Sequence, residues 1–158
     1  MLKFCSLYSG STGNSLLIHS ENTNILIDAG VSAKKITEAL TLLDVNFKDI
    51  SAILVTHEHS DHVQGLGTLS KKFDIPVFAT KKTWDAMPKQ KEKISDVNQK
   101  FFNISENFEI GDLKINSFKT PHDAADSCGF TISKNNSKIS IATDLGHMTT
   151  PILDSISR

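Results

Sequence analysis

The sequence has few cysteines and no long apolar segment. Its two cysteines, Cys5 and Cys128, lie far apart and form no Cys-x-x-Cys pair. This spacing excludes a disulfide-rich scaffold and predicts two free thiols in a cytoplasmic protein. No segment approaches the roughly 20 apolar residues that a membrane-spanning helix requires. The apolar residues before Ser9 end too early for a signal peptide, so we expect neither a leader nor a membrane partner.

A strong charge of either sign is also absent. The formal net charge is −1, which excludes a global electrostatic field that would draw the chain to nucleic acid or to an acidic membrane. The hydrophobic content of 39% is that of an ordinary globular protein. A length of 158 residues predicts a single domain, over residues 1–158, that can bury its own core.

The hydrophobic pattern predicts short strands both before and after the helices. Strands are expected at Leu2–Tyr8, Leu16–His19, Asn24–Ile27, Ile50–Val55, Pro76–Ala79, Phe108–Ile110, Leu113–Lys119, Gly129–Ser133 and Ile139–Ala142. Helices are expected at Ser32–Leu43, Val63–Phe73 and Thr80–Met87, with the start of another after Pro151. The polar segment Lys89–Lys100 is interpreted as a surface loop. This order predicts a mixed α/β or α+β sandwich rather than a simple alternation of strands and helices.

The most informative segment is His57-x-His59-x-Asp61-His62, which follows the expected strand Ile50–Val55. Two imidazoles two residues apart at the end of a strand can point the same way and bind one ion at about 2.1 Å. Asp61 and His62 lie on the turn beyond, where they can face a second ion. An exposed charged loop without function is the alternative, and it explains such a dense cluster poorly.

His122 and Asp144 each follow another expected strand. Taken alone, a histidine after a proline is typical of a surface residue, and an aspartate at a strand end is typical of a turn. The histidine cluster changes this interpretation, because a three-histidine site needs one remote partner. A carboxylate between two cations can bridge both, which makes Asp144 a candidate ligand.

These residues resemble the motif set of the metallo-β-lactamase superfamily. The matching positions are Asp28 after a strand, His57-x-His59-x-Asp61-His62, His122 and Asp144, in that order. Within the superfamily, three further segments resemble the YycJ/WalJ-type group, which is associated with DNA exonuclease activity. They are Ser9–Ser15, His122–Ala125 and Thr143–Gly146. The ligand set is the more specific part of the resemblance.

The resemblance implies an α+β fold, an αββα sandwich, and a role for each motif residue. The implied metal ligands are His57, His59 and His122 for a first ion, Asp61 and His62 for a second, and Asp144 between the two. Asp28 would orient a ligand histidine. The implied cofactor is one or two Zn²⁺ ions, and the same ligands also suit Mn²⁺ and Fe. An aspartate rather than a cysteine at position 144 favours phosphodiesterases and thioesterases over antibiotic hydrolysis.

The sequence departs from the superfamily pattern toward its C-terminal end. The superfamily adds another histidine to the second ion site, but the last histidine here is His147, close to Asp144. Because the chain stops at Arg158, we expect the second half of the sandwich to be incomplete and the second ion to bind weakly. His147 as a substitute ligand is the less favoured alternative. An incomplete second sheet would expose apolar surface and favour association into an oligomer.

The sequence therefore predicts a metal-dependent hydrolase, with a phosphodiesterase or DNA exonuclease that uses a metal-bound hydroxide as the favoured form. Asp61 would take up a proton or steer the nucleophile. Two alternatives stay open: a hydrolase of a small thioester or lactone, and an inactive metal-binding fragment. The expected partner is nucleic acid or another phosphodiester. The loop Ser9–Ser15 and the lysines between positions 71 and 100 could contact phosphates, although a turn and a solvated face explain them more simply.

Overall fold

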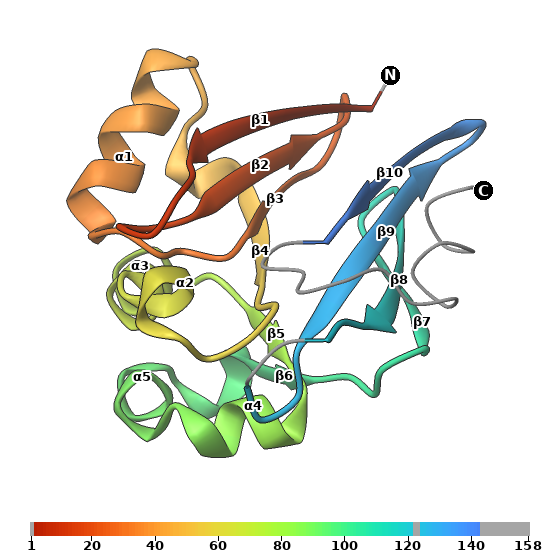
Figure 1. Cartoon of the computed structure of the whole chain (residues 1–158). Helices are drawn as coiled ribbons and strands as arrows, with labels where there is room; N and C mark the ends of the chain where they lie inside the picture. Colours follow the sequence, from red (N-terminus) through yellow and green to blue (C-terminus); the bar gives the residue numbers. More distant parts are fainter. Residues whose placement is uncertain (1, 122–123, 143–158) are drawn as a thin grey trace.

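The computed structural model describes residues 2–121 and 124–142, and it contains two β-sheets with helices on one side (Figure 1). The strands are β1 (Lys3–Tyr8), β2 (Ser15–His19), β3 (Asn24–Ile27), β4 (Ile50–Leu54), β5 (Val77–Ala79), β6 (Gln99–Phe101), β7 (Asn107–Ile110), β8 (Leu113–Lys119), β9 (Cys128–Lys134) and β10 (Ser137–Ile141). The helices are α1 (Ala33–Leu42), α2 (Ser60–Val63), α3 (Leu66–Phe73), α4 (Lys81–Ala86) and α5 (Pro88–Lys93), with short 3-10 turns at Phe47–Asp49 and Asp96–Asn98.

The directions of the strands bring the C-terminal ends of several strands to the same side of the first sheet. Within the described residues this sheet has the order β1-β2-β3-β4-β5-β6, and the second has the order β10-β9-β8-β7. Pairing is antiparallel from β1 to β3 and parallel from β3 to β6. Strands β1, β3 and β4 therefore run the same way, so the segments that follow them meet at the same edge.

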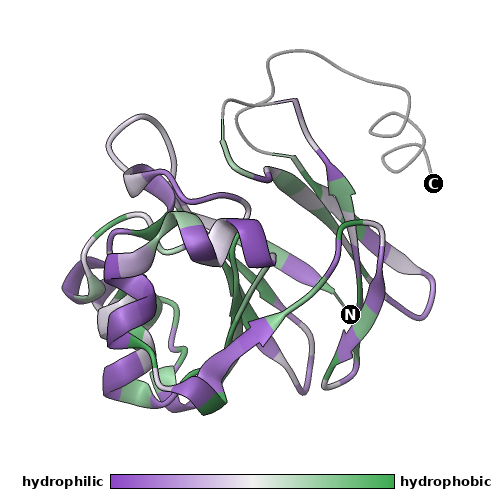
Figure 2. Cartoon of the chain, turned by 90° about the horizontal axis from the view of Figure 1, so that it is seen from below, coloured by the Kyte–Doolittle hydropathy of each residue, from purple (hydrophilic) through white to green (hydrophobic). Residues whose placement is uncertain are grey.

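Two apolar clusters bind the layers together. The first lies between the helices and the first sheet, where Ile36 and Leu40 of α1 and Leu66 and Leu69 of α3 pack with Trp84. The second fills the space between the sheets; it includes Ile18, Ile25, Leu54, Leu113, Ile115, Phe130 and Ile132. Figure 2 shows hydrophobic strand segments between the layers and hydrophilic segments on the helices. The order helix, sheet, sheet confirms the expected sandwich of α+β type.

The segment Lys89–Lys100 was expected to be a loop, and this prediction is wrong. It contains most of helix α5, the second 3-10 turn and the start of β6. Helix α5 packs against α3 at Gly67, whose backbone N–H donates to Gln90 Oε1 at 2.8 Å. An added Cβ at Gly67 would lie 2.8 Å from the Lys93 side chain. Because this contact uses polar residues, α5 has no apolar stripe that the sequence could reveal.

The helix expected at Val63–Phe73 begins at Leu66 as α3, and the short helix α2 ends at Val63, before a break that contains Gly65. The Gly65 N–H donates to the Ala29 carbonyl at 2.8 Å. A Cβ at this position would lie 2.3 Å from the Val31 carbonyl oxygen. The break therefore brings the start of α3 against the segment that follows β3.

The outer face of the second sheet is polar. Leu113 and Ile115 of β8 are buried against the first sheet, whereas Lys114 and Asn116 alternate with them on the outside. A pocket of about 670 Å³ on this face is lined by residues that include Asn107, Glu109, Lys114, Asn116, Thr131 and Lys138. Among the described residues, none of the large exposed hydrophobic side chains lies on this face. The helix expected after Pro151 lies outside the described residues, and among those described no helix has the length and apolar character to span a bilayer.

Candidate metal centre

The candidate centre forms where β3 and β4 end side by side. The parallel register places Ile27 opposite Leu54, so Asp28 and the segment that begins at Thr56 leave the sheet together. The Asp28 N–H continues the ladder by donating to the Leu54 carbonyl at 2.8 Å. Asp28 has a φ of 64°, a left-handed conformation that aspartate adopts more readily than most residues. This turn directs the chain away from the sheet immediately before Gly30.

The carboxylate of Asp28 is a buried acceptor for three donors. The residue is 1% exposed. Its Oδ1 accepts the Thr56 backbone N–H at 2.8 Å, and its Oδ2 accepts the Thr56 hydroxyl at 2.7 Å. His62 Nδ1 lies 2.7 Å from the same Oδ2. A buried carboxylate is tolerated where such donors replace water.

These contacts decide the tautomers of two histidines. The Thr56 hydroxyl has a single proton, which it donates to Asp28, so at 2.9 Å it can only accept from His57 Nδ1–H. His62 Nδ1–H donates to the carboxylate in the same way. In its neutral form each ring therefore carries its proton on Nδ1 and keeps the lone pair on Nε2. One aspartate thus prepares two imidazoles for coordination through the same ring atom, directly for His62 and through a hydroxyl for His57.

The remaining residues of the predicted cluster lie beside these rings. The ring centroids of His57 and His59 are 4.8 Å apart, and those of His57 and His62 are 4.1 Å apart. The Asp61 Oδ2 lies 3.6 Å from His62 Nε2. His57 and His62 are fully buried, whereas the side chain of Asp61 is partly exposed. The donor set of imidazole nitrogens and a carboxylate fits a Zn²⁺-like ion.

The geometry of a complete metal site is not formed by the described residues alone. Among residues 2–121 and 124–142, no group of three or more His, Cys, Asp and Glu side chains is arranged to hold an ion. His122, Asp144 and His147 lie outside the described residues, so the predicted first-ion partner, bridging ligand and substitute ligand stay predictions. The chain on either side of His122 is nevertheless placed by described contacts.

The connection between β8 and β9 is joined to the histidine segment by two hydrogen bonds, from the backbone N–H groups of Ala125 and Cys128. Thr120 and Ser127 close its base, with their hydroxyl oxygens 2.6 Å apart. The Cys128 N–H donates to the Thr56 carbonyl at 3.0 Å, which joins the two sheets at the candidate centre. The Ala125 N–H donates to the Glu58 carboxylate, at 3.0 Å from Oε2. The described residues Ala125 and Cys128 are thereby held against the segment that carries His57 and His59.

Three loops approach one another closely around the cluster. Asn14 N–H donates to the Asp61 carbonyl, and Gly30 N–H donates to the Asn14 carbonyl, each at 2.8 Å. A Cβ at Gly30 would lie 1.8 Å from the Asp61 carbonyl oxygen, which no side chain could tolerate. Gly30 is therefore required for the backbone of the Asp61 segment to approach the loop that follows β1.

Sequence reasoning missed three residues that contact the cluster. Thr56 gave no signal beyond preceding His57, although a hydroxyl next to a metal-ligand candidate could have been read as its hydrogen-bond partner. From the sequence, Asn14 is predicted only as part of a loop that could offer backbone N–H groups to phosphate. Glu58 lies between His57 and His59, and the sequence predicts no role for it. Its only role seen among the described residues is to accept a hydrogen bond from Ala125, which lies 67 positions away. No local pattern reveals such a contact.

Comparison with known proteins gives a consistent result. The sequence matches the family model described as "Beta-lactamase superfamily domain" over residues 23–157. It is 40% identical to "Exodeoxyribonuclease YycJ" of Bacillus anthracis over 147 residues, which make up 93% of this chain and 56% of the relative. It is 36% identical to "Exodeoxyribonuclease WalJ" of Streptococcus pneumoniae over 148 residues, or 92% of this chain and 55% of the relative.

The chain spans about half the length of these curated relatives. Among solved structures it is similar to "MIM-2 Metallo-Beta-Lactamase", with a TM-score of 0.70 and 18% sequence identity. That match covers 83% of this chain and 54% of the other. At this level of identity the likeness concerns the fold.

Proposed function

The chain belongs to the β-lactamase superfamily and has the metallo-β-lactamase fold, and on this basis we propose that it carries the site of a metal-dependent DNA exonuclease. The observation that carries the proposal is the hydrogen-bond network of Asp28. One buried carboxylate fixes the tautomers of His57 and His62 so that both Nε2 atoms can coordinate. A charged loop without function has no need of this arrangement.

The proposed ligands are those that the sequence predicts. They are His57, His59 and His122 for a first ion, Asp61 and His62 for a second, and Asp144 between them. When bound, a Zn²⁺-like ion supplies Lewis acidity at the substrate phosphate and lowers the pKa of a water molecule toward neutrality. Mn²⁺ and Fe suit the same ligands. Asp28 and Thr56 hold the rings in place, and Asp61 accepts a proton or steers the attacking group.

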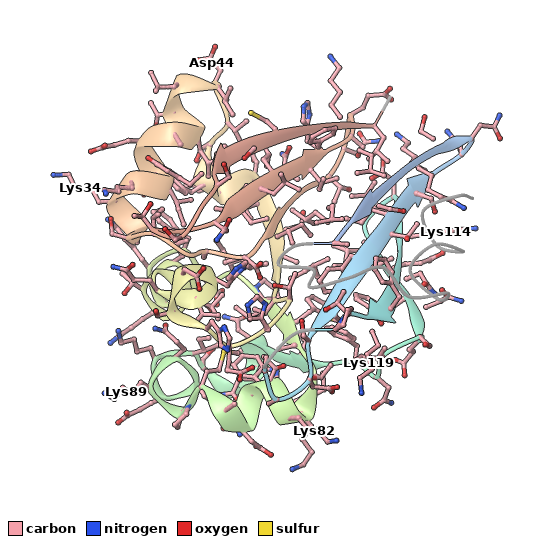
Figure 3. All side chains as sticks on the ribbon, viewed as in Figure 1. Lys34, Asp44, Lys82, Lys89, Lys114 and Lys119 are labelled. Atoms are coloured by element: carbon pink, nitrogen blue, oxygen red, sulfur yellow. The ribbon has the colours of Figure 1, made fainter. Side chains whose placement is uncertain are left out.

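DNA is the proposed substrate because two relatives, matched over more than nine-tenths of this chain, are named exodeoxyribonucleases. The labelled lysines do not gather on one face: Lys34, Lys82, Lys89, Lys114 and Lys119 project from different sides of the molecule (Figure 3). Lys81 is paired with Asp85 at 3.0 Å. The proposal places the contacts with the scissile phosphate at the metal centre.

The test compares metal uptake and hydrolysis in the whole chain and two variants. His59→Ala removes a proposed ligand, and His19→Ala is the matched control because His19 lies on β2 within the sheet. Each protein is loaded with Zn²⁺ or Mn²⁺ and assayed on end-labelled duplex DNA, on bis-p-nitrophenyl phosphate and on a small thioester. We expect nucleotide release that requires metal and is lost in His59→Ala but kept in His19→Ala.

Other outcomes select the alternatives. Turnover of the thioester without release of nucleotides would replace the exonuclease assignment with a small-molecule hydrolase. Metal binding that depends on His59, without hydrolysis of any substrate, would support a metal-binding fragment. Equal metal binding by the wild type and His59→Ala would contradict the proposed centre itself.

A further inference from the structure

The loop between β1 and β2 places the side chain of Asn14 against two of the proposed ligands. Asn14 Nδ2 lies 3.4 Å from Asp61 Oδ2 and 3.3 Å from His62 Nε2. It also lies 3.3 Å from the Asp61 carbonyl oxygen. These side-chain atoms are the ones through which Asp61 and His62 would bind the second ion, so the amide donates where that ion would be held.

The orientation of the Asn14 carboxamide is fixed by the loop itself. Gly10 N–H donates to Asn14 Oδ1 at 3.1 Å, and Asn14 Nδ2 donates to the Gly10 carbonyl at 2.9 Å. This reciprocal pair is satisfied in only one of the two amide orientations, because an N–H cannot accept from another N–H. One amide proton is used by Gly10, and the other is directed at Asp61 and His62.

The backbone around Asn14 keeps the side chain in this position. The Asn14 N–H donates to the Asp61 carbonyl at 2.8 Å, and the Asn14 carbonyl accepts the Gly30 N–H at the same distance. Gly10 has a φ of 115°, and Gly13 has a φ of 154° with no room for a Cβ beside Val31. The glycines of this loop are thus required by the conformation that presents Asn14.

We propose that Asn14 is a positioning residue that holds Asp61 and His62 in a converging arrangement ready for the second metal ion. The inference rests on the proposed function, because the pair has a use only if it binds an ion. With His62 neutral, Asp61 Oδ2 and His62 Nε2 both present lone pairs and lie 3.6 Å apart, an arrangement that a shared N–H donor stabilises before an ion arrives. Once the ion occupies Nε2, the same donor remains for the carboxylate. Preorganisation of this kind raises affinity without adding a ligand.

The test uses the whole chain with the substitution Asn14→Leu, which keeps the shape of the side chain and removes both donor and acceptor. Asn136→Leu is the matched control, because Asn136 is exposed in the turn between β9 and β10. Asn14→Ala is a second variant that keeps the backbone contacts if the larger apolar group disturbs the loop. Thermal melts establish that each variant folds.

Two measurements decide the inference. In the metal-free proteins, long-range ¹H–¹⁵N NMR reports the ring nitrogens of His57 and His62. We expect Asn14→Leu to shift the Nε2 resonance of His62 and to leave that of His57 unchanged. In Zn²⁺ titrations against a competing chelator, we expect the affinity of the ion at Asp61 and His62 to fall about 10- to 100-fold, whereas Asn136→Leu matches the wild type.

The inference and the proposed function fail in different ways. A His62 resonance and Zn²⁺ affinities that are the same in Asn14→Leu, Asn14→Ala and Asn136→Leu would overturn the role of Asn14, even if His59→Ala abolishes binding. A wild-type chain that takes up no Zn²⁺ would instead overturn the metal centre and, with it, the use of the Asn14 contact.

Discussion

At the scale of single residues, Asp28 shows how far a sequence can go in identifying a role. Its place after a strand and its resemblance to a superfamily motif predicted that it orients a ligand histidine. The structure places it 2.7 Å from His62 Nδ1 and adds a link to His57 through Thr56. The link was beyond prediction because it depends on the positive φ of Asp28 and on the parallel register of β3 and β4.

Asp28→Asn is expected to damage the centre while preserving its backbone. Asparagine adopts the left-handed conformation as readily as aspartate, but its amide group would face donors from Thr56 or His62. We expect the free energy of unfolding to fall by about 1–3 kcal/mol and Zn²⁺ affinity to fall about 10- to 100-fold. Chemical denaturation and chelator competition measure the two effects. Asp44→Asn is the control, because Asp44 is exposed and has a φ of 58°; equal effects from both variants would contradict the network.

Cys128 is expected to be an inert thiol beneath the centre. Burial in an apolar environment raises the pKa of this thiol well above its ordinary value, and the negative charges of Asp28 and Asp126 raise it further. The two cysteines are free thiols, and Cys5 is the more accessible. Because the thiolate is the reactive form, Ellman's reagent at pH 8 should modify Cys5 in the native protein and Cys128 only after denaturation. Rapid modification of Cys128 in Cys5→Ser would show this description of the core to be wrong.

At the scale of elements, the sequence predicted those with an apolar pattern and failed where contacts are polar. Helix α1 was found because its apolar residues recur with the helical period, and most strands were found because short apolar runs are bounded by turn residues. Helix α5 was missed because Gln90 and Lys93 are the residues that pack on Gly67. The position of the connection between β8 and β9 could not be predicted from its own sequence either, because it depends on a contact with Glu58 in a distant segment.

Glu58 is expected to hold this connection against the histidine segment. Its carboxylate accepts the Ala125 N–H at 3.0 Å, and a net contribution of about 1.4 kcal/mol from such a bond corresponds to a tenfold change in local opening. We therefore expect Glu58→Ala to speed hydrogen exchange at Ala125 by about tenfold. Glu58→Gln keeps an acceptor oxygen and should exchange at a rate close to that of the wild type.

The exchange of neighbouring amides makes this prediction specific. The Cys128 N–H, which bonds to Thr56, should be protected equally in all three proteins. Uniform acceleration of both amides would indicate general loosening of the sheet contact rather than the loss of one hydrogen bond.

At the scale of the whole molecule, the two sheets are joined by polar contacts at the end opposite the candidate centre. Asp112 lies in the turn between β7 and β8, and Ser20 lies in the turn between β2 and β3. The Ser20 hydroxyl donates to Asp112 Oδ1 at 2.8 Å. Lys134 Nζ lies 2.9 Å from Asp112 Oδ2. A Cβ at Gly111 would lie 2.2 Å from Thr23 Oγ1, so the turns could not approach this closely with any other residue. The sequence of neither turn predicts that the two turns are in contact.

This junction should make stability depend on pH in acid. Hydrogen bonding by Thr23 and by the Lys134 ammonium holds the pKa of the Asp112 carboxyl well below its ordinary value, and hydrogen bonding to Asp112 raises the pKa of Lys134. A carboxyl with a lowered pKa in the folded state stabilises that state above the ordinary value of about 3.9 and loses this contribution as the pH falls through the folded value. Lys134 stays charged throughout this range. Glu21, whose Oε2 lies 3.6 Å from Lys134 Nζ, is unchanged in an Asp112 variant, so comparison of the wild type with that variant isolates the contribution of Asp112.

Asp112→Asn should therefore lower the melting temperature at pH 7, with a difference from the wild type that narrows as the pH falls below about 4. Asp44→Asn removes the same charge from an exposed position and should show no such convergence. Calorimetric melts of the three proteins between pH 7 and pH 2 measure the effect. If the melting temperature of the wild type exceeds that of Asp112→Asn by the same amount at pH 2 as at pH 7, the charge of Asp112 does not join the sheets. The close packing of Gly111 against Thr23 would then be responsible.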